Sequence, residues 1–128
     1  MNELKNQYEE NITTLVSGSE SATNAIRSAD LVVGAVLLPG RKPPIVITEE
    51  DISLMEKGSV IVDVAIDQGG CVEGVKPNTH SEPFEIRSGV IVSAIANLPG
   101  AVPKTSSIEL STNSVSYTHL TLPTSSWV

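Results

Sequence analysis

The chain has 128 residues, of which 40% are hydrophobic but only 3% aromatic, and its formal net charge is −7 at pH 7. This length fits one modest domain, and the scarcity of aromatic residues requires an aliphatic core, which is typical of parallel strands covered on both faces. The negative charge argues against nucleic acid or an acidic membrane as a partner.

Cysteine content and hydropathy indicate the compartment. Cys71 is the single cysteine, which excludes an internal disulfide and favours a reducing environment. The N-terminus is polar and lacks the apolar segment of a signal peptide. No apolar run approaches the roughly 18 residues of a membrane span. We therefore expect a cytoplasmic protein with no membrane partner.

The first part of the chain predicts two helices around a strand. A short helix is expected over residues 2–11, and β-branched residues predict a strand over residues 12–16. A turn follows, and then a helix over residues 21–29 with Ser19 or Ser21 as its N-cap.

An apolar strand is expected next, over residues 30–38, ended by Pro39 and Gly40. Residues 40–44 must form a loop, because prolines forbid regular pairing there, and a short extended piece covers residues 45–47. Thr48 and Asp51 then form a T-x-x-D capping box for a helix that runs through Met55 and stops at Lys57-Gly58.

The second half predicts two further strands and a helix. Residues 59–66 and 90–96 read as apolar strands, separated by a long loop over residues 67–89. A helix is expected after the loop that begins at Asn97, with Pro103 near its first position. The polar tail after Ser114 shows no periodicity and predicts no regular structure.

Alternating strands and helices of this kind predict an α/β fold, a doubly wound parallel sheet. Ligands of such sheets lie beyond the carboxyl ends of the strands. Three loops rich in Gly or Pro follow predicted strands, at residues 39–40, 67–70 and 97–100. We therefore expect these loops to meet at one edge of the sheet.

Two acids near the third strand are candidates for function. Asp67 follows that strand and precedes Gly69 and Gly70, so it could bond a ribose or handle a proton, although Asp-Gly stretches also form ordinary turns. Asp63 lies inside the strand, where a structural role is favoured: an edge-face residue, or a buried acid held by backbone N–H groups.

Other candidate residues give weaker signals. Arg41 and Lys42 could meet a phosphate, but such pairs are more often solvated, and Asn97 lies at a strand end in a Pro-rich connection. Neither histidine has a partner at metal-ligand spacing, so no metal site is predicted. Cys71 has no paired histidine, and the chain contains no G-x-G-x-x-G and no phosphate loop.

Four stretches carry a family resemblance: ADLVVGAVLLPGRKPP, GSVIVDVAIDQGGC, NTHSEP and ANLPGAVPKTSS. In their order and spacing they resemble the nucleotide-binding domain of the alanine dehydrogenase and proton-translocating transhydrogenase family, over residues 4–113. IDQGGC together with ANLPGAVPKTS favours the alanine dehydrogenase branch over the transhydrogenase α subunit.

The resemblance implies an NAD-dependent oxidoreductase that converts L-alanine and water to pyruvate, ammonium and NADH in a homo-oligomer, a hexamer in the family. It makes Asp67 the catalytic aspartate, near the nicotinamide ribose and the reacting water. Lys76 stands where the family usually has arginine. The implied cofactor-binding residues are Ser17, Val36, Leu37, Val64, Ala65, Ile66, Asp67, Ile95, Ala96, Asn97 and Leu98.

The sequence also departs from the family pattern. The strand, Gly-rich turn and helix that seat the pyrophosphate have no counterpart, and neither has the substrate domain. We therefore expect residues 1–114 to be the second half of a Rossmann-type NAD-binding domain, a fragment inactive by itself, and residues 115–128 to be an unstructured, non-native tail. A stand-alone nucleotide-binding module remains the alternative from another class.

Overall fold

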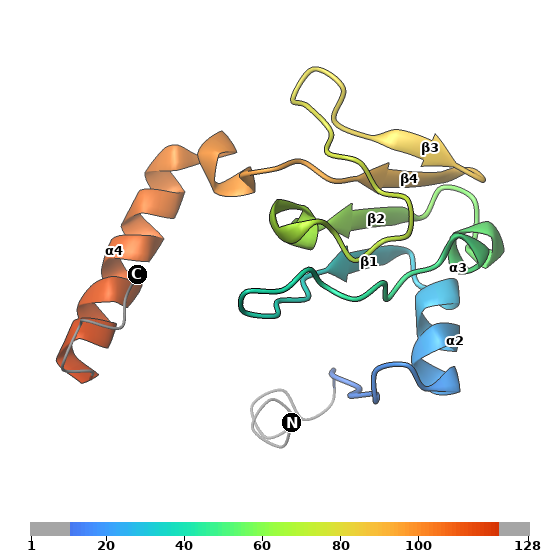
Figure 1. Cartoon of the computed structure of the whole chain (residues 1–128), viewed down its shortest axis with the longest axis horizontal. Coiled ribbons are helices and arrows are strands. Elements are labelled where there is room, and N and C mark those ends of the chain that lie inside the picture. The colour runs from blue at the N-terminus through green and yellow to red at the C-terminus, as the bar shows by residue number, and fades with distance from the viewer. Residues whose placement is uncertain (1–10, 121–128) are drawn as a thin grey trace. The chain divides into compact units, whose positions relative to one another are not determined.

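The computed structural model describes residues 11–120, and the side chains of residues 11–114 (Figure 1). The chain divides into two compact units, Met1–Ala96 and Asn97–Val128. The helix predicted over residues 2–11 therefore lies almost wholly outside the described residues.

The first unit is built on a four-stranded sheet with the order β1-β2-β4-β3. The strands β1 (Leu31–Gly34), β2 (Val60–Asp63) and β4 (Val90–Ser93) are parallel, and β3 (Glu85–Arg87) pairs antiparallel with β4 at one edge. The prediction of an α/β fold with a parallel sheet is confirmed, with one antiparallel strand added.

The strand β3 was not predicted, because it lies inside the long loop expected over residues 67–89. Ser88 and Gly89 join it to β4 with positive φ angles of 51° and 80°. Positive φ at both central residues is the signature of a two-residue type I′ hairpin turn. A Ser-Gly pair directly before the apolar run of β4 was the available signal.

All three predicted parallel strands are shorter than expected. Gly34 pairs with Asp63, the last residue of β2, so β1 has no neighbour to continue with beyond it. The chain after Asp63 turns into the 3₁₀ helix η1 (Val64–Gln68) instead of extending the strand. Beyond β4, Ile95 makes only an isolated bridge, to Asn78.

The strand predicted over residues 12–16 is wrong, because this segment has no regular secondary structure. Ile12, Leu15 and Val16 are 37%, 41% and 67% exposed. A β-branched sequence forms a strand only where a neighbouring strand pairs with it, and no strand of the described sheet does so here.

The helices of this unit begin where local signals placed them. α2 (Glu20–Ser28) is capped by Ser19, whose hydroxyl accepts a hydrogen bond from the Ala22 amide. α3 (Glu49–Leu54) starts with the complete Thr48–Asp51 capping box. It ends earlier than predicted, with Met55 as its C-cap, because Gly58 serves the turn into β2.

The core lies between these helices and one face of the sheet. Ile52 of α3 and its C-cap residue Met55 pack with Ile61, Val90 and Val92 of the strands. The opposite face carries Leu31 and Val33, which are 59% and 56% exposed. Cover on both faces was expected from the composition, but the described residues bury only one.

The second unit consists of the 3₁₀ helix η2 (Leu98–Ala101) and the helix α4 (Pro103–Leu120). Pro103 is the first helical residue, as predicted. The helix continues past Ser114 to Leu120, so the expectation of no regular structure is wrong for residues 115–120. Residues 121–128 lie outside the described part, and the proposed foreign origin of the tail stays a prediction.

Candidate functional site

The carboxyl ends of β1, β2 and β4 lie at one edge of the sheet, because the three strands run parallel (Figure 1). This edge brings together the predicted site residues of the first unit, except Ser17. Val36 and Leu37 follow β1, the stretch from Val64 to Asp67 forms η1 after β2, and Ile95 and Ala96 follow β4.

The other predicted residues lie elsewhere. Ser17 is exposed in the turn before α2, a helix that packs on α3. Asn97 and Leu98 belong to the second unit, where Asn97 occupies the N-cap position of η2 in a left-handed conformation with φ of 53°.

The turn that carries Asp67 begins at Asp63 and ends where the backbone binds the side chain of that same residue. Asp63 is completely buried, and its Oδ2 accepts hydrogen bonds from the backbone amides of Cys71, at 2.9 Å, and Val72, at 3.2 Å. A buried carboxylate requires such partners, and bonds to a charged acceptor are the stronger kind. Of the two interpretations of Asp63, the acid held by backbone N–H groups is confirmed.

Two glycines close the same turn. Gly69, with φ of 112°, donates its amide to the Ile66 carbonyl, and Gly70 donates to the Ala65 carbonyl. A Cβ on Gly70 would lie 2.4 Å from a Val75 methyl and 2.9 Å from the Asp63 carboxylate. Gly70 is therefore required both for its φ of 82° and for the space that Asp63 occupies.

The turn divides its residues between the core and the surface. Ala65 and Ile66 are 3% and 6% exposed, so their side chains pack in the core, and their part in cofactor binding stays a prediction. Val64 is 40% exposed, and Asp67 is exposed as well. The structure thus places Asp67 on a hydrogen-bonded turn at the carboxyl end of β2.

Lys42 is a neighbour of this turn that sequence reasoning did not connect with it. A Cβ on Gly69 would lie 3.0 Å from Cε of Lys42 and 3.1 Å from its Cγ. The aliphatic stem of Lys42 therefore packs over the Gly69 backbone, only two residues from Asp67. The sequence contains the basic pair Arg41 and Lys42, but nothing in it indicates that Lys42 contacts Gly69.

Cys71 fills the space beside the strand β1. A Cβ on Gly34 would lie 2.5 Å from the Cys71 sulfur, and the thiol lies 3.6 Å from Asp63 Oδ1. Burial, reinforced by the adjacent Asp63 carboxylate, raises the pKa of the Cys71 thiol to about 11. A thiol that stays protonated is a poor nucleophile, so the geometry gives Cys71 a packing role.

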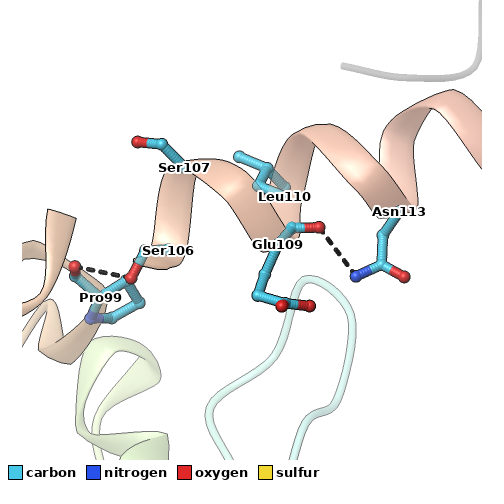
Figure 2. Close-up of a pocket in the computed structure, with 6 residues that line it drawn as sticks. All are labelled: Pro99, Ser106, Ser107, Glu109, Leu110 and Asn113. Atoms are coloured by element: carbon cyan, nitrogen blue, oxygen red, sulfur yellow. Dashed lines mark hydrogen bonds between the residues drawn. The ribbon is translucent and has the colours of Figure 1, made fainter. Parts of the chain in front are cut away.

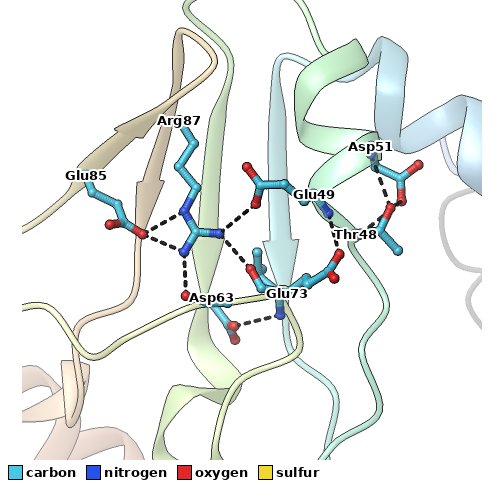
Figure 3. A network of polar contacts seen from close by, with 9 residues as sticks. Thr48, Glu49, Asp51, Asp63, Glu73, Glu85 and Arg87 are labelled. Atoms are coloured by element: carbon cyan, nitrogen blue, oxygen red, sulfur yellow. Dashed lines mark hydrogen bonds and ion pairs between the residues drawn. The ribbon is translucent and has the colours of Figure 1, made fainter.

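A polar network holds the chain just beyond the turn (Figure 3). Arg87 of β3 donates to the carbonyls of Glu73, at 2.6 Å, and Gly74, at 2.7 Å. It also pairs with the carboxylates of Glu85 and Glu49. Its guanidinium, with five donors in a fixed fork, thus fastens the segment after Val72 to β3 and to the start of α3.

The second unit has a hollow of its own, of about 400 Å³, along the start of α4 (Figure 2). The Ser106 hydroxyl donates to the Pro99 carbonyl at one end, and the Asn113 amide donates to the Glu109 carbonyl at the other. None of the predicted site residues lines it. Its lining residues are Pro99, Ser106, Ser107, Glu109, Leu110 and Asn113.

The described part of the chain holds neither a cluster of metal-ligating side chains nor a membrane-spanning helix. Among residues 11–114, whose side chains are described, no group of three or more His, Cys, Asp or Glu side chains could hold a metal ion. Within residues 11–120 no helix is long and apolar enough to cross a membrane.

Known proteins share this arrangement. The family model described as "Alanine dehydrogenase/PNT, C-terminal domain" matches residues 1–127. An alanine dehydrogenase of Bacillus subtilis is 47% identical over 118 residues, and one of Staphylococcus haemolyticus is 45% identical over 119 residues. These alignments cover 91% and 92% of this chain but only 31% and 32% of the relatives, so the chain spans about a third of their length.

Solved structures agree with the family match. A structure titled L-alanine dehydrogenase superposes with a TM-score of 0.80 and 40% identity, covering 91% of this chain and 32% of that one. A transhydrogenase from Sinorhizobium meliloti gives a TM-score of 0.71 at 26% identity, covering 88% of this chain and 32% of its own. The chain therefore belongs to the alanine dehydrogenase/PNT family and lies within its C-terminal domain.

Proposed function

We propose that this chain is part of an NAD-dependent L-alanine dehydrogenase in which Asp67 is the catalytic carboxylate. The observation that carries the proposal is the position of Asp67: an exposed acid on a closed turn at the carboxyl end of β2. Such edges are where open α/β sheets bind their ligands. The similarity to alanine dehydrogenases at 45–47% identity supplies the substrate class.

The residues around Asp67 fit one part of an NAD molecule. Leu37 and Val64 are 67% and 40% exposed at the strand ends, so they offer apolar surface against which a flat ring or a ribose could lie. The cofactor, when bound, supplies the acceptor for a hydride. No Gly-rich phosphate-binding turn occurs in this sequence, so the proposal assigns only the nicotinamide end to these loops.

Within this proposal the residues of the chain divide the work. Asp67 accepts a hydrogen bond from the ribose or takes a proton from the water that attacks the oxidised amino acid. The carbonyls of Ala65 and Ile66 already accept the amides of Gly70 and Gly69, so these two residues shape the turn. L-Alanine or pyruvate as substrate, and assembly into a homo-oligomer, belong to the same proposal.

A transhydrogenase is the runner-up, and identity separates it from the first candidate. The solved transhydrogenase is 26% identical to this chain, whereas the solved L-alanine dehydrogenase is 40% identical. That difference supports the dehydrogenase branch as the proposal.

The test is a chimera in which residues 11–113 replace the matching segment of the Bacillus subtilis relative. We expect alanine-dependent formation of NADH, and we expect Asp67→Asn to lower kcat/KM by about 10²–10⁴-fold, the usual contribution of a general acid or base. Initial rates followed by NADH absorbance give the answer.

Asp30→Asn is the matched control for that substitution. Asp30 is an exposed acid at the amino end of β1, the edge of the sheet opposite Asp67, and the substitution should leave the rate of the chimera unchanged. An active chimera that tolerates Asp67→Asn would remove Asp67 from the mechanism.

A further inference from the structure

We propose that Asp63 is a positioning residue for Asp67: its buried carboxylate ties off the turn and thereby fixes where the Asp67 carboxylate is presented. This inference rests on the proposed function for the role of Asp67. The contact between the Asp63 carboxylate and the returning backbone, called the tie below, is argued from the geometry of Asp63 alone.

The first step is the path of the chain. The backbone leaves the sheet at Asp63, the last residue of β2, and returns at Cys71 to the side chain of that same residue. Asp67 is midway along the segment that this contact closes. Closing a short segment removes most of its conformational freedom, so the position of its middle residue depends on the tie at its ends.

The second step is the tight packing around the Asp63 carboxylate. Asp63 is 0% exposed, and its oxygens meet two backbone amides and the Cys71 thiol. The Gly70 backbone lies so close that a Cβ there would be 2.9 Å from Oδ2. The carboxylate therefore sets the position of the backbone from Gly70 to Val72, and no larger residue could take the place of Gly70.

The third step connects this tie to η1. Gly69 and Gly70 donate their amides to the carbonyls of Ile66 and Ala65, at 3.0 Å and 2.9 Å. These two bonds enclose Asp67 within η1. If the backbone at Gly70 is released, both bonds lose their geometry, although neither involves Asp63 directly.

A competing anchor holds the same segment from the other side. The Cys71 carbonyl accepts the amides of Val46, at 2.8 Å, and Ile47, at 3.2 Å, and Glu73 donates to the Ile47 carbonyl. If this contact alone fixed the turn, replacing Asp63 would weaken the bonds of Cys71 and Val72 but leave those of Gly69 and Gly70 intact. This difference makes the proposal testable.

The experiment is amide hydrogen exchange by NMR on the full chain, comparing wild type with the isosteric variant Asp63→Asn. We expect exchange at Gly69 and Gly70 to accelerate by about tenfold to hundredfold, the size expected for losing a buried bond to a charged group. The reference amides Val60 and Ile91, which donate to Asp30 and Ser59 in the sheet, should change far less.

Asp51→Asn is the matched control. Asp51 is also a buried carboxylate, 5% exposed, but it caps α3. It should destabilise the unit without singling out Gly69 and Gly70. Unchanged exchange at these two glycines in Asp63→Asn would overturn the proposal.

A second measurement covers the case in which Asp63→Asn does not fold. In the wild type, the amides of Gly69, Gly70, Cys71 and Val72 should then open together, with similar protection, as one cooperative unit. Fast exchange at Gly69 and Gly70 beside protected Cys71 and Val72 would show that the carboxylate does not hold the turn, and would overturn the proposal.

The link to Asp67 is tested in the active chimera. Asp63→Asn should lower kcat more than it raises KM, and it should have no further effect when Asp67 is already Asn, because it acts through that residue. A full additional loss in the double variant would contradict the positioning role. If Asp67→Asn alone has no effect, the proposed function fails. The exchange result still shows whether the Asp63 carboxylate holds the turn.

Discussion

At the scale of single residues, the site depends on glycines whose missing side chains leave room for other atoms. Gly70 has both constraints, a left-handed backbone and neighbours that would lie within 3 Å of an added methyl group, whereas Gly58 has only the first. The φ of Gly58, 91°, is close to the 82° of Gly70, but a Cβ on Gly58 would meet nothing within 4 Å. The pair therefore separates backbone strain from crowding.

We expect Gly70→Ala to destabilise the protein more than Gly58→Ala. The left-handed conformation costs an alanine about 1–2 kcal/mol at either position. Crowding against Val75 and Asp63 adds about 1–3 kcal/mol at Gly70 alone. Urea denaturation followed by circular dichroism measures both, and equal losses for the two variants would show that the turn can relax around a methyl group.

Sequence reasoning reached these residues unevenly, for a physical reason. Ser19, Thr48 and Asp51 each accept a hydrogen bond from an amide three residues away, so local rules identify them as capping residues. The partners of Asp63 are eight and nine residues away, and Lys42 meets Gly69 only through the fold. Contacts of that kind leave no mark in a single sequence, and both interpretations of Asp63 therefore stayed open.

At the scale of elements, helix starts were predictable and strand ends were not. A strand continues only while its neighbour does, so β1 stops at Gly34 because β2 stops opposite it. β2 stops in turn because Asp63 captures the returning chain, a contact that the apolar residues Val64 to Ile66 do not reveal. The alternation of strands and helices nevertheless predicted the parallel sheet correctly.

Asp51 couples the helices α2 and α3. Its carboxylate completes the capping box with Thr48 and pairs with Arg27 of α2 at 2.9 Å. Burial by itself would raise the pKa of Asp51, but the hydrogen bonds from Thr48 and Arg27 outweigh it, so the pKa lies below its usual value. One carboxylate therefore supports both the start of α3 and its contact with α2.

This coupling predicts an acid-sensitive contribution to stability. The contribution is fully present above the unfolded pKa, about 3.9, and is lost as the pH falls through the lower pKa of the folded state. We expect Asp51→Asn to remove about 1 kcal/mol at neutral pH, the usual value of a cap, and to flatten the stability curve below pH of about 4.

Chemical denaturation at a series of pH values measures this effect. Glu50→Gln, an exposed neighbour in the same helical turn, is the control and should leave the acid limb of the curve unchanged. A variant at Asp51 with the same acid limb as the wild type would contradict the assignment.

At the scale of the whole molecule, the described residues of the first unit cover one face of the sheet and leave apolar side chains exposed on the other. The covered face carries the core, while Leu31 and Val33 of β1 remain more than half exposed on the other. Apolar side chains exposed on a sheet face become an interface or a site of aggregation when they form a large patch. The chain spans about a third of the length of its relatives. The exposed apolar side chains on this face therefore bear on whether the chain associates when it is studied alone.

We expect the isolated chain to associate as its concentration rises, and Leu31→Lys with Val33→Lys to suppress the association, because charges oppose burial of that face. The control is Thr13→Lys with Asn24→Lys, which adds the same charge at exposed positions away from the sheet. Sedimentation velocity over a range of concentrations distinguishes them. A wild-type chain that sediments as a monomer throughout would contradict the prediction.

The contact between Gly34 and the Cys71 sulfur carries an evolutionary consequence. The two positions share a space too small for a methyl group and a thiol together. Among homologous chains, substitutions at them should therefore be correlated: a residue larger than glycine at position 34 should occur with one smaller than cysteine at position 71. The residues accepted at position 34 thus depend on the residue at position 71, and the reverse holds as well.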